Sequence, residues 1–376
     1  MSFYDEISKI DVDRFRDLVD SRTDQDVERA ICKDSPLDIE DFAALISERA
    51  RVKYLKVMAQ KSAQLTRKRF GRTVSMYIPL YLTNLCNNKC KYCGFSSDNK
   101  FRRVVLTMDE IKAECEAIRK LGFENILLVT GENGRRGGMD YFREVLPLVK
   151  QYAAYLQMEV QPLATEDYAE LKTLGLDSVS VYQETYHPGC YKENHLAGKK
   201  TDMRYRMETP DRLGQAGIDK IGMGALLGLY DWKVDCCALA MHVLYMRKHY
   251  WKSRLSVSFP RLRPAEGGYT PKYPVTDAQT VQLICAWRIF DPELDITIST
   301  REGAHFRDMV VPLGITAMSA QSSIVPGGYA VQEEEEKLGQ WTINDDRTAR
   351  EVVDALHLNG FEAVFHDAST SYFRAV

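Results

Sequence analysis

From about residue 75 to residue 319, the chain repeats a short apolar segment followed by a loop and a helical stretch. This alternation is typical of a parallel sheet covered by helices, because a parallel strand can return to the same sheet only through a crossover. Eight such units over about 250 residues match the size of a (β/α)8 barrel. The expected strands are residues 75–83, 126–130, 157–161, 178–183, 220–225, 255–260, 295–300 and 315–319.

The segments on either side of this repeat have a different character. Before it, apolar residues recur at helical spacing, for example Val27, Ala30 and Ile31. After it comes the acidic run Glu333–Glu336, for which we expect a solvated loop. We therefore predict a helical N-terminal extension, a barrel and a short C-terminal extension, at residues 1–70, 71–330 and 331–376.

The overall composition narrows the class of protein. A chain of 376 residues with 45% hydrophobic content can bury a large core. A net charge of −3 argues against a general nucleic-acid or anionic-membrane binder. No apolar run approaches the length of a bilayer span, and the acidic N-terminus does not resemble a secretory leader. We expect a soluble, cytoplasmic protein.

Three cysteines lie close together after the first expected strand. Cys86, Cys90 and Cys93 have the spacing Cys-x3-Cys-x2-Cys, with Tyr92 directly before the third. Three thiolates on one loop can hold three corners of an iron–sulfur cube, which leaves the fourth iron open for a small ligand. A structural zinc site would usually show a second Cys or His pair, and none follows. The spacing therefore favours a [4Fe-4S] cluster over zinc. We expect the other six cysteines to be small buried hydrophobic residues: Cys32, Cys115, Cys190, Cys236, Cys237 and Cys285.

Polar residues follow several of the expected strands at the point where each strand ends. Gly131 and Glu132 follow the second strand, and Glu184 follows the fourth. Arg301 lies at the end of the seventh and Ser319 at the end of the eighth. Reactive residues of such barrels gather where strands end and the following loops begin. We therefore predict one site at the barrel mouth.

The cysteine motif with its preceding Tyr92 resembles the signature of the radical S-adenosylmethionine (SAM) superfamily. The resemblance implies that SAM binds the open iron and is cleaved by one electron to a 5′-deoxyadenosyl radical. It also implies that Tyr92 lies near the adenine, and that Gly131 and Glu132 receive the methionyl amine. Relatives often have Gly-Gly-Glu at this point, whereas Thr130 replaces the first glycine here.

Two further residues enter the SAM site by the same resemblance. Glu184 is expected to meet the ribose or the methionyl group. Arg212, in the first turn of an expected helix that begins at Thr209, is a candidate for the SAM carboxylate, with a surface arginine as the alternative.

The chain as a whole resembles the tyrosine lyases of thiamine biosynthesis, the 2-iminoacetate synthase family. The resemblance implies that L-tyrosine is split at its Cα–Cβ bond into 2-iminoacetate (dehydroglycine) and 4-cresol. It further implies that Arg301 binds the substrate carboxylate, that Ser319 adds a hydrogen bond, and that Tyr81 borders the amine. The matching stretches are residues 78–86, 128–132, 183–187, 208–212, 258–264, 299–302 and 326–329.

The same resemblance implies two partners, and it leaves three other functions to weigh. The partners are a thiazole synthase that accepts dehydroglycine and an electron donor of the flavodoxin or ferredoxin type.

One alternative function is that of the tyrosine lyase of hydrogenase maturation. That enzyme carries a second cysteine-ligated cluster, whereas the last cysteine here is Cys285. The others are a tryptophan lyase and a non-catalytic iron–sulfur scaffold, which would need no SAM site and no substrate clamp.

Overall fold

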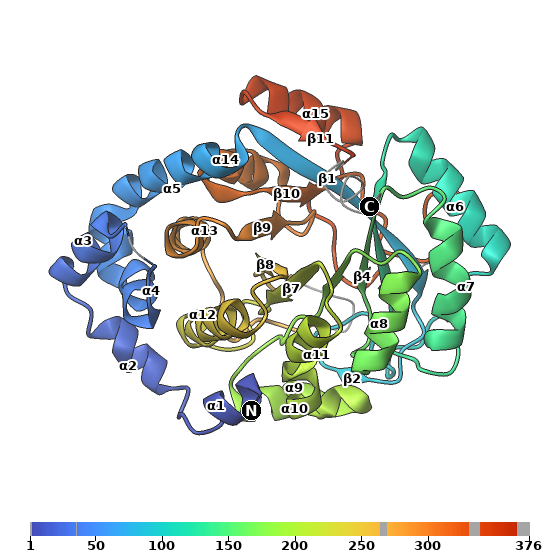
Figure 1. Ribbon diagram of the computed structural model, residues 1–376, viewed down its shortest axis with the longest axis horizontal. Coiled ribbons are helices and arrows are strands. Elements are labelled where there is room, and N and C mark those ends of the chain that lie inside the picture. Colours follow the sequence, from blue (N-terminus) through green and yellow to red (C-terminus); the bar gives the residue numbers. More distant parts are fainter. Residues whose placement is uncertain (1, 35, 264–268, 331–338, 367–376) are drawn as a thin grey trace.

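Eight parallel strands close into a barrel in the computed structural model of the chain, which describes residues 2–34, 36–263, 269–330 and 339–366 (Figure 1). The ring closes where β1 pairs with β10 on one side and with β3 on the other. The predicted (β/α)8 barrel is confirmed, and each of the eight expected strands overlaps an observed one. In order around the ring these are β1 (Thr73–Thr83), β3 (Asn125–Thr130), β4 (Tyr155–Glu159), β5 (Ser178–Ser180), β7 (Lys220–Gly224), β8 (Arg254–Ser258), β9 (Asp295–Ile298) and β10 (Ala317–Ser319).

Helices connect consecutive strands and cover the outside of the ring. Several begin at a side-chain cap; Thr107, for example, accepts a hydrogen bond from the backbone N–H of Glu110 at the start of α6. The connection from β5 to β7 is long and contains α9 (Pro188–Asn194), β6 (His195–Ala197), a 3-10 turn (Lys199–Thr201), α10 (Met203–Met207) and α11 (Thr209–Gln215). The other connecting helices are α6 (Met108–Lys120), α7 (Met139–Val149), α8 (Thr165–Thr173), α12 (Trp232–His249), α13 (Asp277–Phe290) and α14 (Ala304–Gly314).

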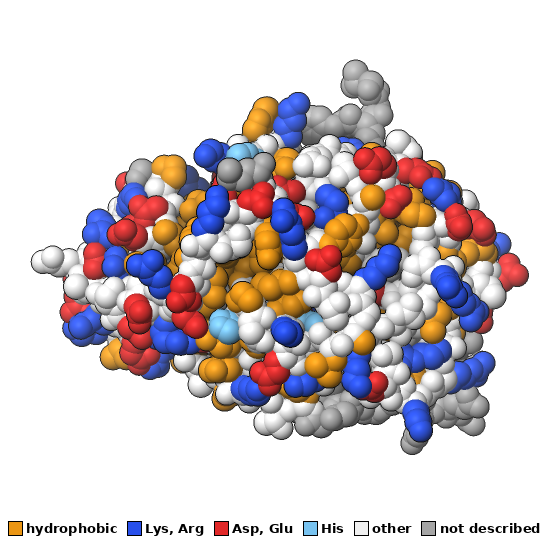
Figure 2. All heavy atoms as spheres, turned by 90° about the horizontal axis from the view of Figure 1, so that it is seen from below, with side chains coloured by type: hydrophobic (Ala, Val, Ile, Leu, Met, Phe, Trp, Pro, Cys, Tyr) orange, Lys and Arg blue, Asp and Glu red, His pale blue; other side chains and the backbone are white. Residues whose placement is uncertain are grey.

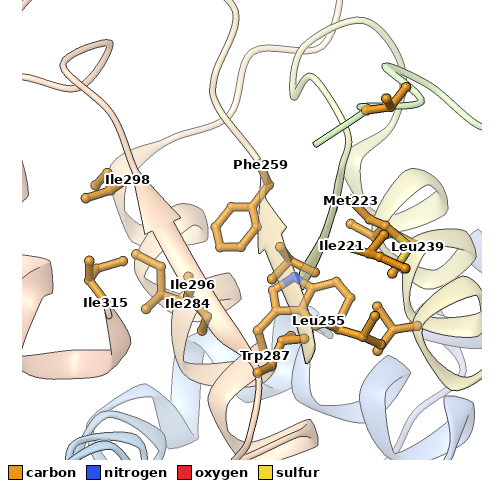
Figure 3. Packing of buried hydrophobic residues seen from close by; sticks show 14 of the residues in the cluster. Ile221, Met223, Leu239, Leu255, Phe259, Ile284, Trp287, Ile296, Ile298 and Ile315 are labelled. Carbon is orange, nitrogen blue, oxygen red and sulfur yellow. The ribbon is translucent and has the colours of Figure 1, made fainter. Parts of the chain in front are cut away.

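The main hydrophobic core lies between the barrel strands and these helices. Figure 3 shows Ile221, Leu255 and Ile296 of three adjacent strands on one side, with Leu239 of α12 and Trp287 of α13 facing them. All five side chains are buried. Because alternate strand residues point outward to this layer, the other half of each strand is left to line the barrel interior.

The N-terminal helices form a further layer outside α12, α13 and α14 (Figure 1). Gln282 of α13 joins the two layers, since its amide donates to the backbone carbonyls of Leu45 and Ser47. The helices of this layer are α1 (Phe3–Ile7), α2 (Arg14–Asp20), α3 (Asp24–Cys32), α4 (Ile39–Leu45), a π-helical turn (Ala50–Tyr54) and α5 (Leu55–Phe70).

The C-terminal part adds α15 (Ala349–Leu358) and β11 (Glu362–Val364). β11 pairs in parallel with the first residues of β1, outside the closed ring. The acidic run Glu333–Glu336 lies outside the described residues, and the domain limits at residues 70 and 330 stay predictions.

Charges are mixed on the visible surface. Figure 2 shows Lys and Arg side chains interspersed with Asp and Glu over one face of the molecule. Among the described residues, no helix combines the length and the apolar character that crossing a bilayer would require.

Candidate active site

A cavity of about 890 Å³, including its open mouth, lies at the carboxyl ends of the barrel strands. Its walls include Tyr81 of β1, Cys93 and Ser319, together with Arg301 beyond β9. Toward the other end of the barrel lies a second cavity with a polar lining, in which Asp295 binds Lys220 (2.8 Å) and Arg254 (3.0 Å). The predicted position of the site, at the mouth where the strands end, therefore coincides with this cavity.

The loop that carries the three cysteines is tied down on two sides. β2 (Lys89–Cys90) pairs with β6 in a small antiparallel sheet. Arg103 donates to the backbone carbonyls of Asn84, Phe95, Ser96 and Asn99, at 2.6–3.2 Å. These bonds hold the backbone on both sides of the cysteines.

The three thiols of this loop lie close enough to influence one another. Burial raises the pKa of Cys86, Cys90 and Cys93, and in Cys90 and Cys93 the neighbouring thiols raise it further. Within the described part of the chain, no three His, Cys, Asp or Glu side chains converge as the ligands of one metal ion would. In a cube each thiolate binds a different iron, so its ligands need not converge on one point.

Gly131 allows the loop after β3 to lie directly against the cysteine loop. A Cβ at this position would be 2.5 Å from the carbonyl oxygen of Leu85 and 3.1 Å from the Cβ of Cys86. The backbone N–H of Gly131 also donates to the carbonyl of Thr83 at 2.9 Å. No larger residue fits here without moving the loop.

Two carboxylates beside the cysteine loop are held by two cations, the buried Arg206 and the largely buried Lys200. Glu132 accepts hydrogen bonds from Asn88 (2.7 Å) and Arg206 (2.9 Å). Glu184 binds Lys200 at 2.7 Å and lies 3.6 Å from Arg206. Burial alone would raise the pKa of Glu184, but Lys200 and Arg206 hold it below its ordinary value. Glu184 is therefore held as an anion, and both carboxylates are held in position by these bonds.

Glu184 also has an unusual backbone. Its φ angle is 71°, in the left-handed region that non-glycine residues seldom adopt. Its carbonyl accepts a hydrogen bond from Leu226 at 2.8 Å, which helps to hold this conformation. Strained residues of this kind cluster at functional sites, because the surrounding structure must compensate for their cost.

The Tyr92 hydroxyl lies 2.8 Å from a ring nitrogen of His195. The other ring nitrogen of His195 lies 2.7 Å from the carbonyl of Tyr191 and is therefore the one that carries the proton. Burial lowers the pKa of His195 to about 3, which keeps the ring neutral and able to accept from Tyr92.

The three residues expected to hold a substrate all line the cavity. The Arg301 guanidinium lies over the Trp341 ring at 4.6 Å, and no side-chain hydrogen bond or ion pair engages it in the described structure. The Tyr81 hydroxyl donates to Gln340 at 2.8 Å, and Ser319 Oγ accepts from the backbone N–H of Thr300 at 3.2 Å. Arg301 is thus an uncommitted cation in a half-buried position.

Five predicted site residues do not line this cavity: Cys86, Cys90, Gly131, Glu132 and Arg212. The first four belong to the cysteine loop and to the loop that lies against it. Arg212 is held elsewhere. Its guanidinium donates to the backbone carbonyls of Leu163 (2.8 Å) and Tyr205 (2.7 Å) and lies over the Tyr205 ring. These contacts tie α11 to the segment before α8, which is a structural task.

Three charged residues of the site were not predicted from the sequence. Lys200 and Arg206 lie in the long β5–β7 connection, where sequence alone does not indicate which side chains turn inward. Glu159, the last residue of β4, also lines the cavity. The sequence does indicate that Glu159 faces the barrel interior, because Tyr155, Gln157 and Glu159 alternate along the strand with the apolar Leu156 and Met158.

Two family models match the chain. The radical SAM superfamily matches residues 80–237, which include the cysteine loop, and the Biotin and Thiamin Synthesis associated domain matches residues 258–362. Among curated proteins, the 2-iminoacetate synthase of Salmonella typhimurium is 52% identical over 97% of this chain and 96% of its own length. The 2-iminoacetate synthase of Escherichia coli is 51% identical over 100% of this chain and 98% of its own length.

Solved structures with the same fold include the [FeFe]-hydrogenase maturase HydG. One HydG structure superposes with a TM-score of 0.88 and 28% identity, covering 99% of this chain and 81% of that one. HydG from Carboxydothermus hydrogenoformans gives a TM-score of 0.83 and 29% identity, covering 96% and 82%.

Proposed function

Since the chain belongs to the 2-iminoacetate synthase family of the radical SAM superfamily, we infer that it cleaves the Cα–Cβ bond of L-tyrosine, giving 2-iminoacetate and 4-cresol. The observation that carries this function to the chain's own residues is one cavity. It is bordered at one side by Cys93 of the cysteine loop and at another by the uncommitted Arg301. A radical generated at the loop would therefore be produced beside the substrate.

We propose that Cys86, Cys90 and Cys93 hold a [4Fe-4S] cluster and that SAM lies between this cluster and Arg301. When bound, the two cofactors supply the 5′-deoxyadenosyl radical that removes a hydrogen atom from the substrate amine. The residues beside the cysteine loop fit a bound cofactor. Gly131 lets the loop after β3 lie directly against the cysteine loop, and Glu132 is oriented by Asn88 and Arg206.

The carboxylates assigned to SAM have their orientation fixed in advance. Glu132 would accept the methionyl ammonium, and Glu184, held by Lys200, would contact the ribose or the methionyl group. Tyr92 would border the adenine mainly through its backbone, because its hydroxyl is bound by His195. Such preorganisation spares the cost of ordering these side chains when the ligand arrives.

The substrate would be held by three groups on the strands that close the barrel. Arg301 would bind the tyrosine carboxylate, because a guanidinium fork matches its two oxygens. Ser319 would donate to the same carboxylate, and Tyr81 would lie along the amine.

Two partners follow from this chemistry. A thiazole synthase would accept 2-iminoacetate directly, since the imine hydrolyses readily in water. An electron donor of the flavodoxin or ferredoxin type would reduce the cluster.

The test is one anaerobic assay of the reconstituted protein with reductant and SAM, in which L-tyrosine is compared with L-tryptophan. We expect 5′-deoxyadenosine and 4-cresol from tyrosine. Deoxyadenosine without 4-cresol would retain the radical SAM chemistry and reject tyrosine as substrate; a tryptophan-derived cleavage product would then indicate a tryptophan lyase. A full cluster without any SAM cleavage would favour the non-catalytic scaffold.

A further inference from the structure

Four acidic or basic side chains line the cavity among the described residues: Glu159, Glu184, Lys200 and Arg301. Glu184 and Lys200 form an ion pair with each other. By contrast, neither Glu159 nor Arg301 has a side-chain hydrogen bond or an ion pair anywhere in the described ranges. Both are half-buried, so each charge has lost part of its water shell without gaining a protein partner.

The uncommitted anion and cation lie on opposite walls of the barrel. In the ring β1-β3-β4-β5-β7-β8-β9-β10, four steps separate β4 from β9, which is half of the circumference. Glu159 ends β4, in register with Val129 of β3, and Arg301 follows β9. A cavity with one free negative and one free positive group matches a zwitterion, and a free α-amino acid is a zwitterion at neutral pH.

The stoichiometry of the cleavage calls for a proton acceptor at the amine. The ammonium of tyrosine carries three hydrogens, and the imine nitrogen of 2-iminoacetate carries one. The radical step removes one of the two lost hydrogens as an atom. The other must leave as a proton, with its bonding electron pair remaining on nitrogen.

We propose that Glu159 binds the α-ammonium of the substrate and accepts this proton. The N–H bond breaks heterolytically, an O–H bond forms on the Glu159 carboxyl, and the neutral amine is then ready to lose a hydrogen atom. This assignment rests on the proposed function. Glu132 and Glu184 are poorer acceptors, because cations and amide donors already hold them.

The surroundings of Glu159 suit a base that works near neutral pH. The pKa of Glu159 is raised to about 7, because burial and the charge of Glu184 raise it more than the charges of Arg301, Lys200 and Arg206 lower it. A general base is most effective when its pKa lies near the working pH. The titratable or charged groups that act on Glu159, or on which Glu159 acts, are Glu184, Lys200, Arg206, Arg301, Tyr77, Tyr81 and Tyr182.

Binding of three ligands tests the ammonium contact. L-Tyrosine, tyramine (no carboxylate) and 3-(4-hydroxyphenyl)propionate (no ammonium) would be titrated into the cluster-loaded protein with SAM and without reductant. Glu159→Gln should weaken L-tyrosine and tyramine by about 10- to 100-fold, the worth of a hydrogen bond to a charged group, and leave the propionate unchanged. Arg301→Gln should weaken L-tyrosine and the propionate and spare tyramine.

Kinetics test the proton transfer. In wild-type protein we expect the acidic limb of the pH profile of kcat/KM to reflect Glu159, and this limb should disappear in Glu159→Gln. Glu159→Asp should restore part of the rate, because it keeps the carboxylate. Glu116→Gln, an exposed change on α6, should match wild type throughout.

The outcomes separate this inference from the proposed function. If wild type forms 4-cresol and Glu159→Gln binds all three ligands as wild type does, or keeps its acidic limb, the inference is overturned while the lyase stands. If wild type forms no 4-cresol, the proposed lyase function is rejected. The expected changes in binding of the three ligands would even then support an amino-acid binding site at Glu159. Cluster absorbance and circular dichroism of each variant would show that it has folded.

Discussion

Arg206 of α10 and Arg212 of α11 are six positions apart and have different surroundings. Arg206 is buried and binds Glu132 and the carbonyl of Tyr182, whereas Arg212 is bound by carbonyls and a ring outside the cavity. Only Arg206 therefore orients a carboxylate assigned to SAM.

Replacing each arginine by methionine separates the two tasks. Arg206→Met removes a buried cation from two carboxylates, and breaking a buried pair costs about 3–5 kcal/mol. We expect SAM binding to weaken at least tenfold, and SAM cleavage without tyrosine to fall similarly. Arg212→Met should leave SAM binding within about twofold, because a modest loss of helix anchoring does not reach the cavity. Calorimetric SAM titration of both variants checks this, and equal losses would contradict it.

Glu159 should also reduce the stability of the protein above neutral pH. Its pKa is raised from 4.5 to about 7, so the folded state binds a proton that the unfolded state releases. The free energy of unfolding therefore falls as pH rises from about 4.5 to 7, and the full cost is present at pH 8. Glu159→Gln removes this cost, on the order of 1–3 kcal/mol.

The measurement is the thermal midpoint of wild type and Glu159→Gln, recorded anaerobically at pH 8 and pH 5. The variant should melt a few degrees higher at pH 8, and the difference should shrink at pH 5. An unchanged or lower midpoint at pH 8 would mean that the folded protein already compensates the charge.

At the scale of elements, the β3–α7 loop packs closely against the cysteine loop. A Cβ on Gly131 would overlap the carbonyl of Leu85, which precedes Cys86. Gly131→Ala should therefore displace the cysteine loop and reduce iron bound after reconstitution by more than half. Gly134→Ala is the matched control, because a Cβ there meets nothing within 4 Å. Full iron content in Gly131→Ala would show that the loop can shift without loss of the cluster.

The sequence predicted those elements whose signals are local. The eight strands were found because each is a short apolar run, and the cysteine loop because its spacing is distinctive. The long connection after β5 was not resolved, since the direction of Lys200 and Arg206 depends on how that segment packs across the barrel mouth. Arg212 was predicted to bind the carboxylate of SAM, because Pro210 marks the start of its helix. In the structure it is Arg206 that lies beside Glu132 and Glu184, the two carboxylates assigned to the SAM site.

Glu159 illustrates a different limit. The inward alternation of β4 can be read from the sequence, but its lack of a partner cannot. Whether a carboxylate is paired depends on residues from other strands, such as Glu184 and Arg301, whose positions become known only once the ring has closed. Charge pairing is therefore a property of the assembled barrel.

At the scale of the whole molecule, the N-terminal helices are built into the barrel. Gln282 of α13 is buried, and its amide donates at 2.9 and 2.8 Å to the carbonyls of Leu45 and Ser47, at the end of α4. Ser62 of α5 similarly donates to the carbonyl of Leu313 in α14. Such bonds satisfy backbone groups that a helix end would otherwise leave unpaired in the interior.

Gln282→Leu tests whether this layer and the barrel unfold together. The change removes the Gln282 donor from both carbonyls; Ser47 keeps its bond from the backbone N–H of Arg51, so the cost of about 1–3 kcal/mol falls mainly on the buried Leu45 carbonyl. If the two layers form one cooperative unit, the single unfolding transition should move to lower denaturant concentration with its slope unchanged. Gln151→Leu, at an exposed position after α7, should have no comparable effect. A second, earlier transition in Gln282→Leu would instead mean that the N-terminal helices detach while the barrel and its cavity stay folded.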